Sequence, residues 1–275
     1  MHFDLIQSLS LAGNPATPND DRAGTGDTHG WVIDGATDLG PPGLVGARGG
    51  AAWLADRAQR AFTGAAPAES IEGLCEAVAA QLAADYAAAR TRDPLDRWEL
   101  PIAAFLAVRI GDGALECGWL GDCVGLHRRG DSVTRIGPPR EAGEAEAQSA
   151  ASLAQHGLGS VQRSAPILDA LRASRNRPGR TVLGVEPEVM TRLRTLRIDC
   201  APGDTLLLMT DGFAALIDSY AAFDEPGLMA ALDEQGLDAL ATRLRAIERE
   251  DAACARYPRF KRSDDATALW LRIGG

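Results

Sequence analysis

The feature that most restricts the fold of this chain is a run of alternating apolar residues that ends in a tight-turn signal. Apolar side chains occupy every second position from Ile102 to Ile110, which is typical of a β-strand. Gly111-Asp112-Gly113 follows directly and predicts a hairpin. Further short strands are expected to continue a meander over residues 114–120, 124–127 and 132–136. Because a hairpin joins antiparallel strands, the centre of the chain predicts an antiparallel sheet.

Helical patterns are separated in the sequence from these strands. Apolar residues fall on one face of two predicted helices, over residues 54–62 and 71–86. Three more helices fit after Gly212, the last of them over residues 237–247. Other strands are predicted over residues 3–11, 31–33, 191–198, 205–210 and 266–273. Hairpins with segregated helices predict an α+β fold rather than a repeated β-α-β unit.

Residues 137–180 differ in character from the rest of the chain. The part over 137–163 holds few large apolar residues, so we expect a weakly packed, partly helical excursion there. The part over 163–180 carries five arginines and is the most basic stretch of the chain. A solvated face is the simpler interpretation of these charges, and a substrate-facing flap is the alternative.

Composition excludes several classes of function. The chain has 275 residues, 45% of them hydrophobic, and a net charge of −10, whereas binding of nucleic acid needs a basic footprint. Its five cysteines form no CxxC pair, which argues against a zinc site and a disulfide framework. We find no signal-peptide pattern at the start of the sequence, and no apolar run approaches the roughly 18 residues of a membrane span. We therefore expect a cytoplasmic protein with neither nucleic acid nor a membrane as partner.

Four short acidic motifs each adjoin a predicted strand. They are Asp34-Gly35, Gly121-Asp122, Asp211-Gly212 and Asp264-Asp265. Strand ends that meet at one rim of a sheet can gather carboxylates from distant parts of a sequence, and Mg²⁺ and Mn²⁺ favour such oxygen ligands. Taken singly, each motif also fits a turn, a helix N-cap or a solvated loop. Taken together, they predict a site for divalent cations.

The order of these motifs resembles that of a known family. The matching segments are Asn19-Asp20-Asp21, Val32-Ile33-Asp34-Gly35, Gly118-Trp119-Leu120-Gly121-Asp122, Pro202-Gly203-Asp204 through Asp211-Gly212, and Asp264-Asp265-Ala266-Thr267. Over nearly the whole chain they resemble the metal-dependent type 2C protein phosphatases, the PPM class of serine/threonine phosphatases, and in particular its bacterial-like single-domain members. The resemblance implies one domain over residues 1–275 with a flap or excursion at 137–180. It also implies a four-layer αββα sandwich, in which two antiparallel sheets are flanked by helices.

The resemblance further implies a centre that holds two Mn²⁺ or Mg²⁺ ions. Asp34 matches the carboxylate that bridges the two metals, and the backbone carbonyl of Gly35 would add a ligand. Asp211 and Asp264 would complete the ligands of the first metal. The predicted catalytic residues are therefore Asp34, Asp211 and Asp264.

Three other aspartates are implied as metal ligands of the same centre. Asp20 stands in place of the usual glutamate of the family, with Asp21 beside it, and would act largely through water. Asp122 matches the aspartate that helps to hold a third, weaker metal in some members. Two divalent ions can activate a shared water to attack phosphorus, so neither a Ser-His-Asp set nor a catalytic cysteine is needed.

The implied activity is hydrolysis of phosphoserine or phosphothreonine in a protein that a cognate kinase has phosphorylated. The chain departs from the family at Ala16, where an arginine usually binds the substrate phosphate, and at Asp265, where asparagine is common. Arg22 or an arginine of 163–180 is a candidate replacement for the phosphate-binding arginine. The rival hypothesis is a catalytically weak or inactive phosphatase-like module that binds a phosphoprotein or a regulator.

Overall fold

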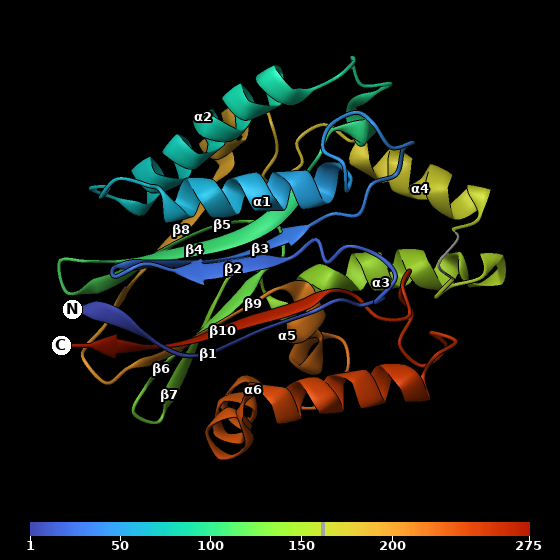
Figure 1. The fold of residues 1–275 in the computed structure, drawn as a ribbon. Helices are drawn as coiled ribbons and strands as arrows, with labels where there is room; N and C mark the ends of the chain where they lie inside the picture. The colour runs from blue at the N-terminus through green and yellow to red at the C-terminus, as the bar shows by residue number, and fades with distance from the viewer. Residues whose placement is uncertain (161–162) are drawn as a thin grey trace.

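Two antiparallel five-stranded sheets form the centre of the molecule (Figure 1). The computed structural model describes residues 1–160 and 163–275. One sheet has the strand order β1-β10-β9-β6-β7 and the other has the order β2-β3-β4-β5-β8. The first sheet consists of β1 (His2–Leu11), β10 (Ala266–Gly274), β9 (Thr205–Met209), β6 (Val124–Arg129) and β7 (Ser132–Ile136). The second consists of β2 (Arg22–Thr25), β3 (His29–Gly35), β4 (Ala103–Gly111), β5 (Ala114–Leu120) and β8 (Arg194–Asp199).

Helices cover the outer face of each sheet (Figure 1). The helices α1 (Gly50–Thr63) and α2 (Ile71–Ala89) pack on the second sheet. The helices α5 (Asp211–Asp218) and α6 (Glu225–Glu250) pack on the first, and α6 is kinked at Gly236, where the backbone is not helical. This arrangement confirms the predicted α+β fold with four layers in the order αββα. The short 3-10 helices are η1 (Arg97–Glu99), η2 (Arg140–Gly143), η3 (Ala154–His156) and η4 (Pro187–Arg192).

Apolar side chains fill all three spaces between the four layers. Successive side chains of a strand point to opposite faces, so Ile33 and Phe105 face the α1 and α2 helices. Their neighbours Val32 and Leu106 face the other sheet, where they belong to one core with Leu208. Strands buried on both faces explain why apolar runs such as that of β4 are nearly continuous in the sequence.

The central meander predicted from the sequence is wrong in one respect. The hairpins β4–β5 and β6–β7 form as predicted, but β5 and β6 belong to different sheets. The three residues between them include Gly121, whose φ of +88° lets the chain turn sharply into the other sheet. Alternation reports which side chains are buried, but it does not report which sheet a strand joins.

The first strand also departs from simple alternation. A bulge lies between Leu5 and Gln7 in the pairing of β1 with β10. Phe3 therefore packs between the sheets, whereas Leu9 packs against the helical side, and Leu5 is 53% exposed. One extra residue in a strand is sufficient to exchange its faces.

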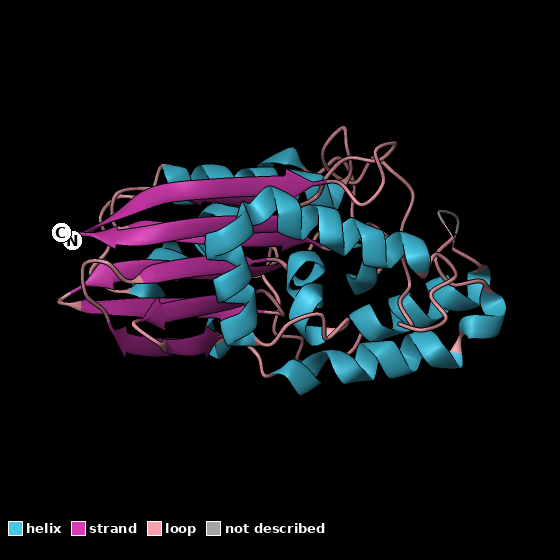
Figure 2. Cartoon of the chain, turned by 90° about the horizontal axis from the view of Figure 1, so that it is seen from below, coloured by secondary structure: helices cyan, strands magenta, loops and turns pink. Residues whose placement is uncertain are grey.

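Residues 137–180 form two helices at the end of the sheets that lies opposite the two termini (Figures 1 and 2). These helices are α3 (Glu144–Ser152) and α4 (Ala165–Arg175), and residues 161–162 of the predicted flap lie outside the described residues. A small core of Ala150, Ile167 and Phe260 holds the helices together. The side chains of Arg172 and Arg175 donate hydrogen bonds to backbone carbonyls of residues 37–39.

All five cysteines are buried free thiols, in agreement with the expectation that they form no disulfide framework. None of the helices in the described ranges combines the length and the apolar composition that crossing a bilayer requires.

Candidate metal centre

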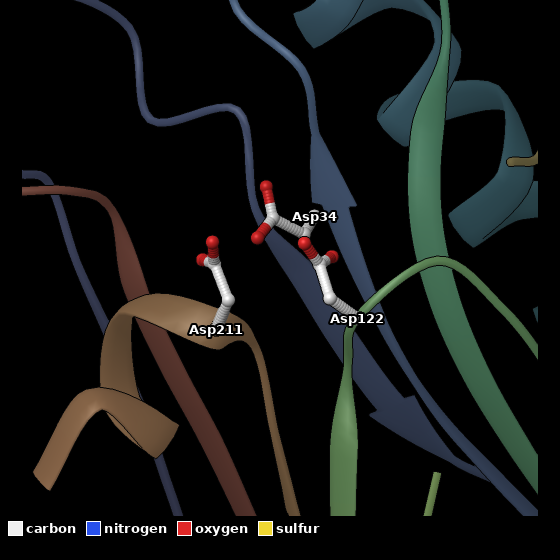
Figure 3. A group of neighbouring side chains, drawn as sticks. All are labelled: Asp34, Asp122 and Asp211. Atoms are coloured by element: carbon white, nitrogen blue, oxygen red, sulfur yellow. The ribbon is translucent and has the colours of Figure 1, made fainter. Parts of the chain in front are cut away.

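Three of the predicted aspartates converge where the two sheets end. Asp34 lies near the end of β3, Asp122 lies in the turn between β5 and β6, and Asp211 is the first residue of α5. One carboxylate oxygen from each lies within 4.8 Å of those of the other two. Figure 3 shows that the three carboxyl groups point toward one another. A single divalent ion could contact oxygens from both sheets at this point.

The three carboxyl groups strongly disfavour their own ionisation when no cation is bound. Burial, followed by the charges of Asp122 and Asp264, raises the pKa of Asp211 to about 7. Burial and the charge of Asp211 raise the pKa of Asp34 well above its usual value. Water reaches Asp122, but the surrounding protein and the charge of Glu146 raise its pKa to about 6. A divalent cation would offset this repulsion, so the carboxyl groups fit such an ion.

Asp21 lies close to this group, and one of its buried oxygens has no partner among the described residues. The hydroxyl of Thr210 donates a 2.7 Å hydrogen bond to Oδ2 of Asp21. Oδ1 of Asp21 and Oδ1 of Asp211 are buried and have no hydrogen-bond partner among the described residues. A buried oxygen without a donor is costly. A site that binds a cation, or the water around a cation, is expected to present such oxygens.

Asp20 lies on the loop that precedes β2, and Asp265 holds this loop in place. The two carboxylate oxygens of Asp265 accept hydrogen bonds from the backbone N–H groups of Gly13 and Asp20, at 2.8 Å and 2.7 Å. The N–H of Gly35 donates to the carbonyl of Asp20 at 3.2 Å. Burial and the charge of Asp265 raise the pKa of the Asp20 carboxyl to about 7. The aspartate at position 265 therefore acts as a clamp on the loop, a role that no local sequence pattern indicates.

Asp264 lies beside the convergent group and not within it. Its Oδ1 accepts hydrogen bonds from Nζ of Lys261 at 2.5 Å and from the N–H of Asp265 at 2.8 Å. Burial alone would lower the pKa of Lys261, but the carboxylates of Asp264, Asp34 and Asp211 outweigh burial and raise it. Lys261 thus supplies a positive charge at the centre, and the sequence analysis did not find it because it lies in an irregular segment.

Arg22 is engaged in the support of the same loop. Its guanidinium donates to Oδ1 of Asp56 at 2.7 Å, to the carbonyl of Asn19 at 2.8 Å and to the carbonyl of Asp21 at 2.5 Å. Nη2 of Arg22 also lies 2.6 Å from Asp56. This geometry does not favour the prediction that Arg22 binds the substrate phosphate, because most of its donors are already used.

The glycine that follows Asp211 permits the close approach of two strand ends. A Cβ atom at Gly212 would lie 2.0 Å from the carbonyl oxygen of Asp265, a distance that no pair of nonbonded atoms tolerates. A Cβ at Gly121 would lie 2.4 Å from the Cβ of Ala104. In these two acidic motifs, the aspartate brings charge and the glycine lets the backbones meet.

Replacement of Gly212 by alanine is therefore expected to lower stability and metal affinity together. The backbone of residues 264–265 must move, at a cost of about 1–3 kcal/mol in the free energy of unfolding, or several degrees in melting temperature. Thermal melting and Mn²⁺ titration would measure the two effects. Gly73→Ala is the matched control, because its Cβ would meet only Oγ of Ser70 at an ordinary 3.6 Å. A Gly212→Ala protein with unchanged melting and Mn²⁺ affinity would refute this explanation.

Comparison with known proteins assigns the chain to a family. The family model described as Protein phosphatase 2C matches residues 15–247. The chain therefore belongs to the protein phosphatase 2C family. No curated protein sequence matches the chain.

Solved structures of phosphatases share the fold. The serine/threonine phosphatase PstP/Ppp of Mycobacterium tuberculosis matches with a TM-score of 0.59 and 16% identity, and the match covers 100% of each chain. PppA, a regulatory component of the T6SS in Pseudomonas aeruginosa, matches with a TM-score of 0.56 and 16% identity over 99% of this chain and 98% of that one. The catalytic domain of PstP in complex with two manganese ions matches with a TM-score of 0.55 and 13% identity over 100% and 99%. At these identities the similarity is one of fold.

Proposed function

We propose that this protein hydrolyses phosphoserine and phosphothreonine in proteins with the help of bound Mn²⁺ or Mg²⁺. The observation that carries the proposal is the convergence of Asp34, Asp122 and Asp211 from three separate elements within 4.8 Å. Membership of the protein phosphatase 2C family supports it. The two manganese ions in the similar PstP catalytic domain support the choice of metal.

The residues have distinct proposed roles. Asp34 and Asp211 would hold the metals together with Asp264, which must release Lys261 in part to do so. The carbonyl of Gly35 would add a ligand beside Asp34. Bound ions of this type lower the pKa of water and offset charge on phosphoryl oxygens. The protein itself fixes two of these carboxylates in direction, because Asp34 lies near the end of β3 and Asp211 at the start of α5.

Three more aspartates would complete the site. Asp20 and Asp21 would act through water, since the loop that carries them is held by Asp265. Asp122 is accessible to water and would help to hold a third, weaker ion. We further propose that residues 1–275 act as one domain in the cytoplasm, with 137–180 as a flap over the substrate. The substrate would be a phosphoprotein made by a cognate Ser/Thr kinase.

Ala16 favours the rival function, a weak or inactive module that binds a phosphoprotein or a regulator. The N–H of Ala16 donates to Asn14 Oδ1 at 2.9 Å, and a methyl side chain offers nothing to a phosphate. The metal-binding carboxylates favour the enzyme, because a module that only binds would not need them all.

Hydrolysis of p-nitrophenyl phosphate with and without millimolar Mn²⁺ separates the two functions. We expect turnover only with the metal, and loss of turnover when EDTA is added. Circular dichroism in the same buffers would establish that the protein is folded. A folded protein with no turnover at millimolar Mn²⁺ would overturn the enzymatic proposal and favour the binding module.

A further inference from the structure

A basic groove lies beside the metal centre, in a protein whose net charge is −10. Its volume is about 430 Å³, and it is formed by the segment after α4, the η4 segment and the loop before β4. The charged residues that line it are Arg97, Arg175, Arg180, Arg192, Glu186 and Glu188. Four guanidinium groups thus face two carboxylates, which leaves the groove with an excess of positive charge.

Most of this positive charge has no carboxylate partner. Arg97 pairs with Glu186, and Arg175 donates to the carbonyl of Thr37, at 2.7 Å. No ion pair or side-chain hydrogen bond is formed by Arg180 or Arg192 within the described ranges 1–160 and 163–275. An alanine Cβ at Gly179 would lie 3.0 Å from Nη1 of Arg192, so this guanidinium lies against the turn that carries Arg180.

One residue that lines the groove, Arg180, lies near the metal centre. The carboxylates whose charges act on Arg180 are those of Asp122 and Glu146, while burial lowers its pKa. Thr181, the next residue, lines a smaller cavity of about 310 Å³ together with Gly121. The backbone of Leu183 then pairs with Ala103, the partner of Gly35 in the sheet. The backbone that follows Arg180 is therefore anchored to the sheet beside the metal centre.

We propose that this groove selects phosphoproteins that carry an acidic side chain near the phosphorylated residue. The inference rests on the proposed phosphatase function, since it places the phosphate at the metal centre and the neighbouring part of the substrate in the groove. Planar guanidinium groups bind carboxylates in a bidentate manner. Arg180 is half-buried and Arg192 is exposed. A guanidinium that is partly removed from water gains more from such a contact than an exposed one does. Arg180 and Arg192 are assigned as the residues that recognise the acidic side chain.

The test compares two phosphothreonine peptides that differ only in glutamate or glutamine beside the phosphorylated residue. The wild-type protein is expected to favour the glutamate peptide in kcat/KM by on the order of fivefold to tenfold, as a charge-assisted arginine–carboxylate contact provides. In the double variant Arg180→Gln, Arg192→Gln the ratio is expected to fall to about one. Arg249→Gln, which removes one positive charge from the exposed end of α6, should keep the wild-type ratio.

The outcomes distinguish the two proposals. A wild-type ratio of kcat/KM near one would overturn selection by the groove. An equal decrease in kcat/KM for both peptides in the double variant would also overturn it, and would assign the arginines to binding of the phosphate itself. If neither peptide is hydrolysed, the proposed function fails, and fluorescence anisotropy of labelled peptides still measures the preference of the groove. Stronger binding of the glutamate peptide that is lost in the double variant would then support the groove without catalysis. Equal binding of the two peptides would overturn it.

Discussion

Replacement of Asp211 by asparagine is expected to abolish Mn²⁺-dependent phosphatase activity. Asparagine keeps the shape of the side chain but removes one negative charge from a group in which Asp34, Asp122 and Asp211 lie within 4.8 Å. Removal of residues that merely support metal ligands costs about 10–100-fold in metal affinity or activity, so loss of a direct ligand should exceed about 100-fold. Steady-state kinetics at increasing Mn²⁺ would measure the loss.

The same substitution is expected to stabilise the protein in the absence of metal. The charges of Asp122 and Asp264 act against ionisation of Asp211, so a neutral amide relieves repulsion. At pH 8 the melting temperature in EDTA should rise, by about 2–4 °C for each kcal/mol relieved. The increase in melting temperature that Mn²⁺ causes in the wild-type protein should disappear. Asp131→Asn, at the exposed turn between β6 and β7, should change neither the melting temperature in EDTA nor its increase with Mn²⁺. A variant that retains wild-type turnover would refute the assignment of Asp211 as a ligand.

The metal-free protein is expected to lose stability as the pH rises from about 5 to 8. The pKa of Asp20 and of Asp211 is raised to about 7, and that of Asp122 to about 6. In the unfolded chain these carboxyl groups have ordinary values near 4. The folded state therefore binds more protons across this range, and its stability falls as the pH passes through the raised values.

Bound Mn²⁺ should reverse this trend. The ion competes with protons for the carboxylates, so it stabilises the folded state more at pH 8 than at pH 5. Thermal melting in EDTA and in Mn²⁺ across this range would measure both slopes. A metal-free melting temperature that is constant or rises between pH 5 and 8 would show that the carboxylates do not repel one another as described. A Mn²⁺-induced increase that is equal at pH 5 and pH 8 would show that the ion does not displace their protons.

Much of the fold could be predicted because local sequence patterns specify its strands and helices. The alternation of Ile102 to Ile110 and its glycine turn placed the β4–β5 hairpin correctly. The apolar stripe of α2 placed a long helix correctly. The bulge in β1 and the crossing from β5 to β6 were missed, because each depends on which distant strand is available as a partner.

The sequence by itself determined most of the strands and helices and the identity of the acidic motifs, because periodicity and turn chemistry act between residues that are close along the chain. It did not predict β2, whose residues lie in a stretch rich in turn-forming residues. Only the tertiary structure decided how those motifs act. It brought Asp34, Asp122 and Asp211 together and made Asp265 the clamp of a loop. Electrostatic and hydrogen-bonding effects depend on distances in space. Packing of the two sheets sets those distances between residues that lie far apart in the sequence, such as Asp34 and Asp122, 88 positions apart, or Gly13 and Asp265, 252 positions apart.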